Sequence, residues 1–247
     1  MIGCAGARPR RPGARFRRPA MEARRIALFP LHTVLFPEMP LPLHVFEERY
    51  RQLVARSLEN GQPFGVVLIA RGGEAGPPAT PRQAGTLARI AGVQHLEEGR
   101  LNILCVGTER FRILEHTAAE APWVTGIVEA FRDVPADAAS LRPLQEEVGG
   151  LFGAYIGGLL GLAGVETPEY ELPEEPEAFS FVVAAVLPFD AESRQELLEL
   201  TDTATRLTIE RDVLRQEAGR LTTAARAVPL RVDQLRSSSD PSFPSKN

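Results

Sequence analysis

The stretch LPLHVFEERYRQLV, residues 41–54, decides how the first half of the chain folds. Pro40 and Pro42 alternate with leucines, and proline lacks the backbone donor that a central strand needs, so the stretch begins as an extended segment at a sheet edge. Glu47 and Glu48 then favour the N-terminus of a helix, and Gly61 is a natural stop just past its end. The predicted buried face of this helix consists of Tyr50, Leu53, Val54 and Leu58.

The surrounding sequence, residues 24–134, has the pattern of turns and apolar runs that predicts a β-rich domain with one helix. Apolar or alternating runs predict strands at 25–31, 63–71, 86–96, 100–116 and 123–131. The run Glu97-Glu98-Gly99 suits a hairpin turn, and the Gly/Pro-rich residues 72–85 predict a long loop without an apolar anchor. Several short strands with one helix indicate a small barrel or two packed curved sheets.

Residues 137–226 carry helical patterns instead. The predicted helices lie at 141–164, 176–188, 193–200 and 203–223. In the last helix Leu207, Leu214 and Leu221 recur every seven residues, and Arg206 and Glu210 stand one turn apart, where they can form an ion pair. The leucine repeat is compatible with a weak homodimer through this helix, but three repeats are too few to indicate a coiled coil. A face packed inside a helical bundle is the favoured interpretation.

One segment, residues 148–165, carries no charge and places Gly153, Gly157 and Gly161 four residues apart. Its length would allow a marginal membrane span with a small-residue face. Seven of its eighteen residues are glycine, its flanks are acidic and it has no aromatic belt. We therefore favour a tightly packed helix, whole or broken, in a soluble domain, and expect no membrane association.

The charges are unevenly distributed along the chain. Residues 1–20 hold six arginines and no acidic residue, which leaves 22 of the 28 basic residues against 32 acidic ones from residue 21 onward, a net charge of −10. This acidic body is a poor electrostatic match for nucleic acid. Residues 1–23 lack the apolar core of a secretory signal, and we interpret them as a disordered leader or as a start assigned ahead of Met21. Residues 227–247 are interpreted as a mostly disordered tail.

Lysine and cysteine are scarce, which limits the chemistry available. Lys246 is the only lysine, whereas a phosphate-binding P-loop and a Ser-Lys dyad each need a lysine in a folded site. Cys4 and Cys105 are the only cysteines, too few for a disulfide framework and without a CxxC pair for zinc. We therefore expect no cofactor and no metal, and a reducing cytoplasm as the location.

Four blocks, in this order, resemble the LON substrate-binding domain, the N-terminal module of Lon-type proteases that also occurs alone. They are RIALFPLHTVLFPEMPLPLHVFEERYRQLV, FGVVLI, GTLARI and EGRLNILCVGTERFRI. Further along, RQELLEL and TDTATRLTIERDVL resemble the helical subdomain that ends in a long helix in Lon. The similarity covers residues 24–225. It implies an α+β fold, with a PUA-like β pseudobarrel over 24–134 followed by an α-helical bundle over 137–226.

The resemblance implies substrate recognition without catalysis. In full-length Lon the long helix continues into an ATPase module and a Ser-Lys protease, and we expect neither here because the chain ends about twenty residues past Ala225. The expected function is to bind unfolded or degron-bearing polypeptides, or to act as an adaptor for a protease or chaperone partner. One alternative is an RNA-binding PUA-like module. Another is a hydrolase that uses Cys105, although its apolar neighbours favour a buried, unreactive thiol.

The FPEMP turn, residues 36–40, and the strand after it are the best candidates for a binding site. Adaptable methionine and aromatic surface in a Pro-rich loop suits promiscuous binding of apolar chains, unless both side chains tuck under the loop. His44 has no second ligand at metal spacing, so a histidine that bonds to the backbone is favoured. The candidate residues are Phe36, Pro37, Met39, Leu41, His44 and Tyr50.

A second set of residues is assigned a structural role through charge: Glu47, Arg49, Arg110 and Arg112. Glu47 and Arg49 are expected to hold the strand–helix junction against nearby strands. Arg110 and Arg112 alternate along a strand and therefore share one face. Pairing of these arginines with Glu47, Glu48 or Glu109 is favoured over binding of an acidic partner.

Overall fold

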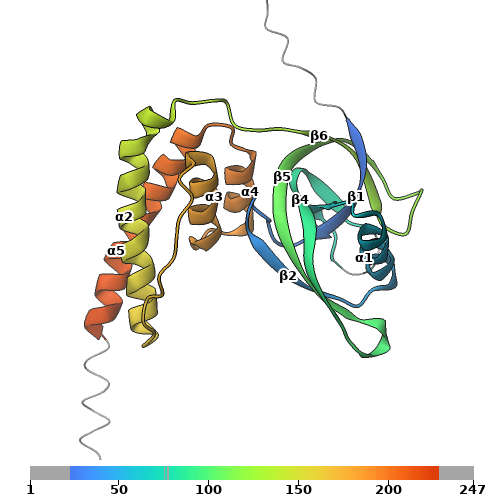
Figure 1. Cartoon of the computed structure of the whole chain (residues 1–247), viewed down its shortest axis with the longest axis horizontal. Helices are drawn as coiled ribbons and strands as arrows, with labels where there is room; N and C mark the ends of the chain where they lie inside the picture. Colours follow the sequence, from blue (N-terminus) through green and yellow to red (C-terminus); the bar gives the residue numbers. More distant parts are fainter. Residues whose placement is uncertain (1–22, 75, 77, 228–247) are drawn as a thin grey trace, which may run out of the picture.

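The computed structural model describes residues 23–227 with the exception of 75 and 77. The predicted basic leader and disordered tail, residues 1–22 and 228–247, lie outside the described residues. Figure 1 shows two bodies side by side, one built mainly of strands and one built of helices. We call them the β domain, residues 24–130, and the helical domain, residues 138–227.

The β domain is a barrel of one mixed sheet. Its strands are β1 (Arg24–Leu31), β2 (Pro40–Val45), β3 (Phe64–Arg71), β4 (Thr80–His95), β5 (Leu101–Thr117) and β6 (Val124–Ala130). They are ordered β2-β5-β4-β3-β1-β6, and an additional β5–β6 pairing closes the ring. Of these six described strands, only β1 and β3 pair in parallel.

The closure depends on the length of β5. Its first part, Leu101 to Val106, pairs with β2, and its later part, Phe111 to Thr117, pairs with β6. Strand β4 occupies the other edge of β5 from Leu101 to Arg112. Among the described residues, strand β2 therefore has a neighbouring strand on one side only, as its two prolines predict.

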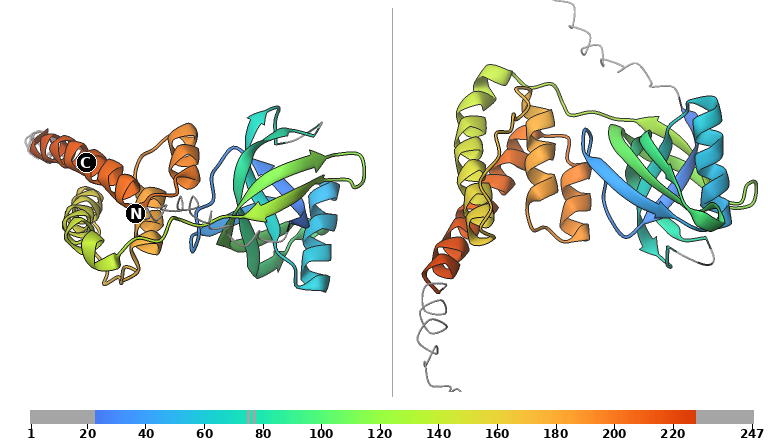
Figure 2. Two further views of the ribbon diagram at one scale, coloured as in Figure 1. Left: turned by 90° about the horizontal axis from the view of Figure 1, so that it is seen from above. Right: turned by 60° about the horizontal axis from the view of Figure 1, so that its bottom comes forward.

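Helix α1 (Glu48–Asn60) covers the side of the barrel farthest from the helical domain (Figure 2). It ends as predicted at Gly61, whose φ of 62° lies in the left-handed region that glycine adopts readily. The predicted face was wrong at one position, because Leu58 is 48% exposed at the end of the helix. The other three face residues are buried, and Tyr50 stacks on Phe29 with ring centroids 4.0 Å apart.

The predicted 72–85 loop was too long. Strand β4 already begins at Thr80, because the small apolar side chains of Ala79, Pro81 and Ala84 are buried and anchor this part of the chain. The hairpin between β4 and β5 is confirmed, and its turn is the short 3-10 helix η1 (Glu97–Gly99).

The helical domain consists of α2 (Ala138–Leu162), α3 (Pro176–Val186), α4 (Ala191–Glu199) and α5 (Thr203–Ala227). An acidic side chain accepts a hydrogen bond from a backbone N–H at each helix start, which satisfies groups that the helix itself leaves unpaired. These residues are Asp137, Glu175, Asp190 and Asp202. Helices α3 and α4 lie on the side of the β domain, and α2 and α5 lie on the outside (Figures 1 and 2).

The glycine-rich segment forms the unbroken second half of α2 up to Leu162, and its last three residues lie past the end of the helix. Its apolar residues Val148, Phe152 and Tyr155 are buried against α3 and α5. A Cβ at Gly158 would lie 3.1 Å from a methyl of Leu221, so this glycine allows α2 and α5 to approach closely. Across the described part of the chain, no helix combines the length and the apolarity that a membrane crossing requires.

The leucine repeat of α5 faces the inside of the helical domain. Leu207 and Leu214 have no exposed surface, and Leu221 packs against the same cluster. The packed bundle face is therefore confirmed. Because this chain already covers these leucines, the repeat does not offer a seam to a second copy.

The two domains share an apolar cluster. Val34, Phe36 and Leu68 of the β domain pack against α3 and α4 residues that include Phe181 and Leu198. A polar contact crosses the same boundary, since the Gln195 amide donates to the Ala84 carbonyl at 3.1 Å. The segment that connects the domains is also attached to the helical domain, because the Val134 N–H donates to the Thr201 carbonyl at 2.8 Å. The domains therefore contact each other through packed, buried surface.

Candidate functional site

The FPEMP turn lies at the domain boundary, which corrects the prediction that Phe36 is available for binding. Phe36 is 1% exposed, and its ring lies 5.7 Å from that of Phe181 in α3. The turn cannot absorb this ring by itself, but the helical domain, 145 residues further along the chain, covers it. Met39 is partly buried and packs against both the barrel core and the domain-boundary cluster.

The remaining candidates separate into inward and outward positions. Leu41 and Tyr50 face the barrel core, Leu41 partly exposed and Tyr50 buried. Burial raises the pKa of Tyr50. Pro37 borders a cleft of about 230 Å³ between the domains. His44 is exposed on β2, where its Nδ1 lies 2.8 Å from the Asn102 side-chain oxygen, a side-chain partner in place of the expected backbone one.

A continuous exposed surface runs along β2 and its partner β5. Successive strand residues point to opposite faces, so the even-numbered residues of β2 share the outer face. Leu104 pairs with Pro42 across the ladder and is 43% exposed, and the Phe46 ring at the end of the strand is 56% exposed and 6.0 Å from His44. We call these six residues the β2 surface: Pro40, Pro42, His44, Phe46, Asn102 and Leu104.

Sequence reasoning missed Phe46 and Leu104. The signal was the alternation itself. A period of two carried past His44 selects Phe46, and the same period places the apolar Leu104 on the outer face of β5 beside Asn102. A prediction built on side-chain period and strand pairing would have found both residues.

The free edge of β2 is poor in backbone donors. The Met39 carbonyl accepts from the Gly107 N–H at 3.0 Å, so the backbone polar groups of Met39 face β5. Because backbone direction alternates along a strand, the backbone N atoms of residues 40, 42 and 44 face away from β5. Two of these positions are proline and carry no hydrogen. Contacts to the β2 surface must therefore come mainly from side chains.

A cleft of about 260 Å³ lies where β2 meets α1. Its walls include Phe29, Phe46 and Tyr50, and its rim carries the acidic residues Glu47 and Glu74. This cleft can hold an apolar side chain, and its rim favours a neighbouring positive charge.

Arg49 holds the rim of this cleft together. Its guanidinium lies 3.0 Å from the Glu47 carboxylate, donates to the Glu74 carbonyl at 2.9 Å and stacks 4.5 Å from the Tyr50 ring. The expectation that Glu47 and Arg49 hold the strand–helix junction together agrees with these contacts.

Arg110 has other partners than those predicted. It forms ion pairs with Asp133 and, at 2.9 Å, with Glu177, and donates to the Leu200 carbonyl at 2.7 Å. The expected partners Glu47, Glu48 and Glu109 do not pair with it, because its side chain points into the domain boundary. Arg112 does share the face of Arg110, and both guanidinium groups lie 4.6 Å from the Phe131 ring.

Asp133 connects the β domain to α5. Besides pairing with Arg110, it accepts from Arg206 at 2.6 Å and from the Thr203 hydroxyl at 2.5 Å. Burial opposes ionisation of Asp133, but the hydrogen bond and charge of Arg206, helped by Thr203 and Arg110, lower its pKa. This buried network links the β domain to α3 and α5 at the domain boundary.

The predicted Arg206–Glu210 ion pair was wrong. Arg206 instead donates to Asp133 and to the Ser180 hydroxyl at 2.7 Å. Both carboxylate oxygens of Glu210 are buried without a hydrogen-bond partner, and burial raises the pKa of Glu210 well above its usual value.

Cys105 does not fit the hydrolase alternative. The side chain is fully buried in the barrel core, and burial raises its pKa to about 12, so the thiol stays protonated near neutral pH. A nucleophilic cysteine needs the opposite shift and partial exposure. Within the described ranges no three His, Cys, Asp or Glu side chains gather in a way that could hold a metal ion.

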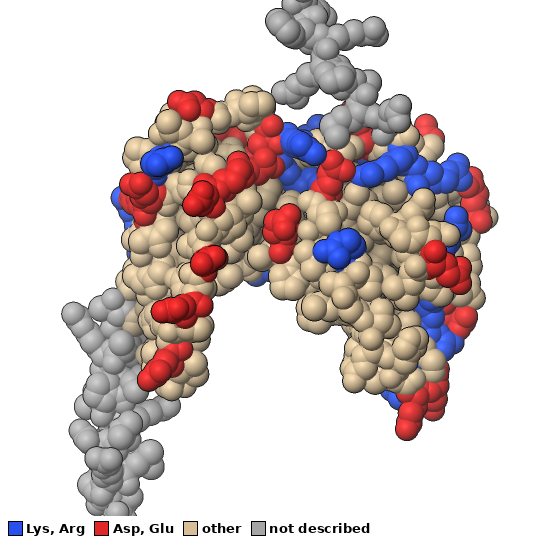
Figure 3. Space-filling model, in the orientation of Figure 1, with Lys and Arg blue, Asp and Glu red and all other residues tan. Residues whose placement is uncertain are grey.

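The two domains enclose a wide hollow beside β2. Figure 3 shows this hollow below the domain boundary, with walls that are mostly uncharged on the face in view. Strand β2 starts near α4 and runs along the side of the β domain that borders the hollow (Figure 1). An extended apolar chain could therefore lie along β2 without meeting a concentration of charge.

A family model described as the ATP-dependent protease La (LON) substrate-binding domain matches residues 25–216, which cover nearly all of the β domain and most of the helical domain. The chain belongs to the LON substrate-binding domain family. The family and the α+β fold implied by the resemblance are thereby confirmed. The match concerns the substrate-binding part of the protease.

Curated relatives of this LON-domain chain are Lon proteases. Lon protease 2 of Myxococcus xanthus is 27% identical over 191 residues, covering 74% of the chain and 22% of the relative. Lon protease of Paraburkholderia phytofirmans is 30% identical over 192 residues, covering 75% of the chain and 23% of the relative. The chain thus spans less than a quarter of the length of these relatives.

Solved structures resemble the chain over both domains. The Lon N-terminal domain protein from Xanthomonas campestris is 30% identical, with a TM-score of 0.57 over 75% of this chain and 95% of that one. The N-terminal domain of the Mycobacterium avium complex Lon protease is 17% identical, with a TM-score of 0.52 over 78% and 98%. The second likeness concerns the fold alone.

Proposed function

We propose that this LON domain binds unfolded or degron-bearing polypeptides along the β2 surface, either for its own use or as an adaptor for a protease or chaperone. The observation that carries the proposal is the row of exposed apolar side chains, Pro40, Pro42, Phe46 and Leu104, beside a hollow whose walls are mostly uncharged on the face in view (Figure 3). Exposed apolar rows of this kind on otherwise polar surfaces mark interaction sites. The substrate-binding family of the chain supports the same conclusion.

The ligand is an extended segment with spaced apolar side chains. The rings of proline and phenylalanine give contact area without fixing a donor pattern, so one surface accepts many sequences. The cleft at the β2–α1 junction receives one apolar side chain, and Glu47 and Glu74 at its rim favour a basic residue next to it. We place this binding in the cytoplasm, because the chain contains only two cysteines and Cys105 is a buried free thiol.

The test is fluorescence anisotropy of a labelled, permanently unfolded polypeptide titrated with the full chain. We expect saturable binding in the micromolar range that survives moderate salt. The double variant Phe46→Ser/Leu104→Ser should weaken it at least tenfold. The matched control Leu58→Ser/Leu114→Ser removes two leucines that are equally exposed elsewhere, at 48% and 54%, and should leave affinity unchanged.

Two results would contradict the proposal. Absence of binding at tens of micromolar, roughly the weak end of useful recognition, would exclude a general polypeptide binder. If both double variants weaken polypeptide binding equally, the β2 surface is not the specific binding site. Binding to RNA that falls steeply with salt would instead favour the RNA-binding alternative, which the acidic composition opposes.

A further inference from the structure

A second cleft lies at the other end of α1, between that helix and strands β1 and β6. Its volume is about 390 Å³, within the range of roughly 300–1,000 Å³ typical of ligand pockets. We call it the α1–β6 pocket. The residues used in the argument are Arg25, Ile26, Leu53, Arg56, Asn60 and Trp123.

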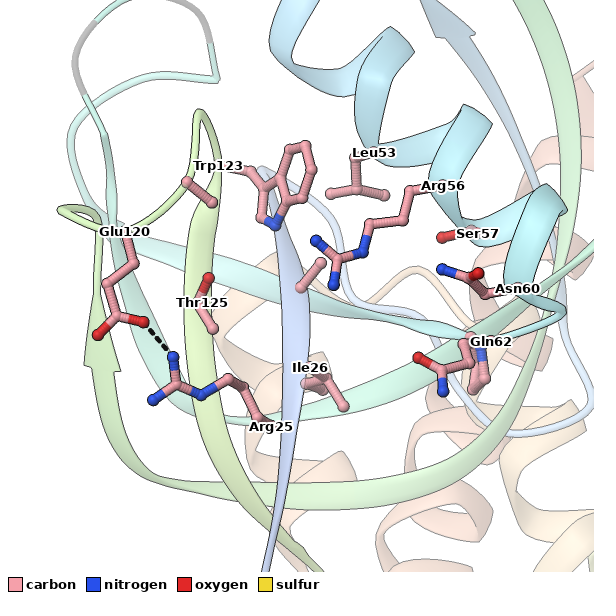
Figure 4. Close-up of a pocket in the computed structure, with 13 residues that line it drawn as sticks. Arg25, Ile26, Leu53, Arg56, Ser57, Asn60, Gln62, Glu120, Trp123 and Thr125 are labelled. Atoms are coloured by element: carbon pink, nitrogen blue, oxygen red, sulfur yellow. Dashed lines mark hydrogen bonds and ion pairs between the residues drawn. The ribbon is translucent and has the colours of Figure 1, made fainter.

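The floor of the α1–β6 pocket is apolar. Ile26, Leu53 and Trp123 are buried at its base, and their surfaces are the walls against which a ligand side chain would pack. Figure 4 shows the Trp123 ring at one end of the pocket with its indole nitrogen directed toward the interior. An indole N–H in this position is a donor for a ligand oxygen.

The rim of the α1–β6 pocket is rich in donors and carries excess positive charge. The Arg56 guanidinium lies in the middle of the pocket, 5.9 Å from the Trp123 ring, and has no carboxylate partner among the residues that the structure describes (Figure 4). Arg25 pairs with the exposed Glu120 on the other side. The charged groups that line the pocket are therefore two arginines and one glutamate, in a chain whose net charge is −4.

A ligand that matches this arrangement carries an anionic group directly beside an apolar group. The C-terminal residue of a polypeptide has this form, because its α-carboxylate and its side chain leave the same Cα atom. An internal aspartate or glutamate does not, since its carboxylate ends its own side chain. Arginine binds carboxylates through two parallel hydrogen bonds, and the side-chain amide of Asn60 at the rim can bond to the preceding peptide group.

We propose that the α1–β6 pocket captures the C-terminal residue of a polypeptide, with the free carboxylate on Arg56 and an apolar side chain on the floor formed by Ile26, Leu53 and Trp123. The inference rests on the proposed function only in taking the ligand to be a polypeptide. The β2 surface would then hold an extended segment, and the α1–β6 pocket would add selectivity for chains with a free apolar C-terminus.

The test uses the only tryptophan of the chain, Trp123, as a reporter inside the pocket. Acetyl-Ala-Ala-Leu with a free carboxylate is titrated into the full chain while tryptophan emission is recorded. We expect a saturable change, and at least tenfold weaker binding of the same peptide as its C-terminal amide. An amidated acetyl-Ala-Asp-Leu, with an internal carboxylate, should bind no better than the plain amide.

Variants separate the pocket from its surroundings. Arg56→Gln should weaken binding of the peptide with a free carboxylate at least tenfold and leave the affinity for the C-terminal amide unchanged. Arg51→Gln is the matched control, because it removes the same charge from the same helix but Arg51 pairs with Glu48 outside the pocket. It should change the affinity less than twofold.

Three results would overturn the inference: no emission change at about 1 mM acid peptide, equal affinity for acid and amide, or preference for the internal carboxylate. Phe46→Ser/Leu104→Ser should bind the acid peptide normally. Failure of the β2 surface and failure of the α1–β6 pocket therefore give different results.

Discussion

Replacing Asp133 with asparagine tests whether the buried charge network fixes the domain boundary. Asp133→Asn keeps the shape of the side chain but removes the charge that two buried guanidinium groups share. Arg110 is 2% exposed and Arg206 has no exposed surface, so neither can be solvated in place. Removing one partner from a buried ion pair costs about 3–5 kcal/mol, because the remaining charge is left uncompensated. We expect a loss of unfolding free energy in this range.

The magnitude depends on the partners that remain. Arg110 keeps Glu177 at 2.9 Å and two backbone carbonyls, whereas Arg206 has no second carboxylate within ion-pair distance among the described residues. The loss should therefore come mainly from Arg206. Asp133→Asn combined with Arg206→Met, which replaces the charge with apolar volume, should recover much of the stability.

The loss should also depend on pH in a defined direction. The pKa of Asp133 is lowered in the folded protein, so its contribution is present above the unfolded value of about 3.9 and is lost as pH falls through the folded pKa. The difference between wild type and Asp133→Asn should therefore be full at pH 7 and shrink below about pH 4.

The assay is urea unfolding followed by circular dichroism at pH 7 and at several lower pH values. Asp212→Asn is the matched control, since Asp212 pairs with Arg211 on the surface and is 59% exposed; its effect should stay within about 0.5 kcal/mol. A loss below about 1 kcal/mol for Asp133→Asn, or a loss that grows toward low pH, would refute the reasoning.

Three further predictions concern buried positions. Glu210→Met should raise the unfolding free energy by about 1–3 kcal/mol at pH 7, because it removes a buried carboxyl group that has no hydrogen-bond partner. This gain in stability, measured by denaturant unfolding, should shrink as pH falls toward about 4.3. A gain independent of pH would contradict the raised pKa of Glu210. Phe36→Ala should lower the unfolding free energy measured with denaturant by about 3–5 kcal/mol, whereas the exposed Phe46→Ala should change it by no more than about 0.5 kcal/mol. Similar losses for the two variants would mean that Phe36 is not buried. Gly85→Ala should lower the melting temperature measured by calorimetry, because its Cβ would lie 2.4 Å from a β3 carbonyl oxygen; an unchanged melting temperature would place this contact in doubt.

Much of the fold could be predicted because its signals are local. The edge strand follows from the absence of a backbone donor at Pro40 and Pro42, and the end of α1 follows from Gly61, where only a few neighbouring atoms decide the conformation. The bundle face of α5 follows from the spacing of Leu207 and Leu214. In each case the relevant period or residue type lies within one element.

The positions that were mispredicted depend on contacts between distant parts of the chain. Phe36 is exposed or buried according to whether Phe181 covers it, and nothing in the turn itself specifies that packing. Arg110 pairs with Asp133 and Glu177, which come close to it only when the two domains contact each other. The acidic residues near it in the sequence do not face its side chain. The sequence did contain one signal for this network. Arg206 precedes Leu207, a leucine of the α5 repeat that was predicted to be buried, and a charge at such a position needs a buried partner.

The prolines of β2 have a consequence for a protein that handles unfolded chains. A sheet edge with free donors and acceptors is a template on which an extended polypeptide adds itself as a further strand, and other copies can follow. Pro40 and Pro42 remove two of the three donors on the outward side of β2 and leave only the His44 N–H, so a chain held at this surface cannot form a continuous ladder. The ligand can thus bind and dissociate through its side chains while the edge itself resists amyloid-like growth.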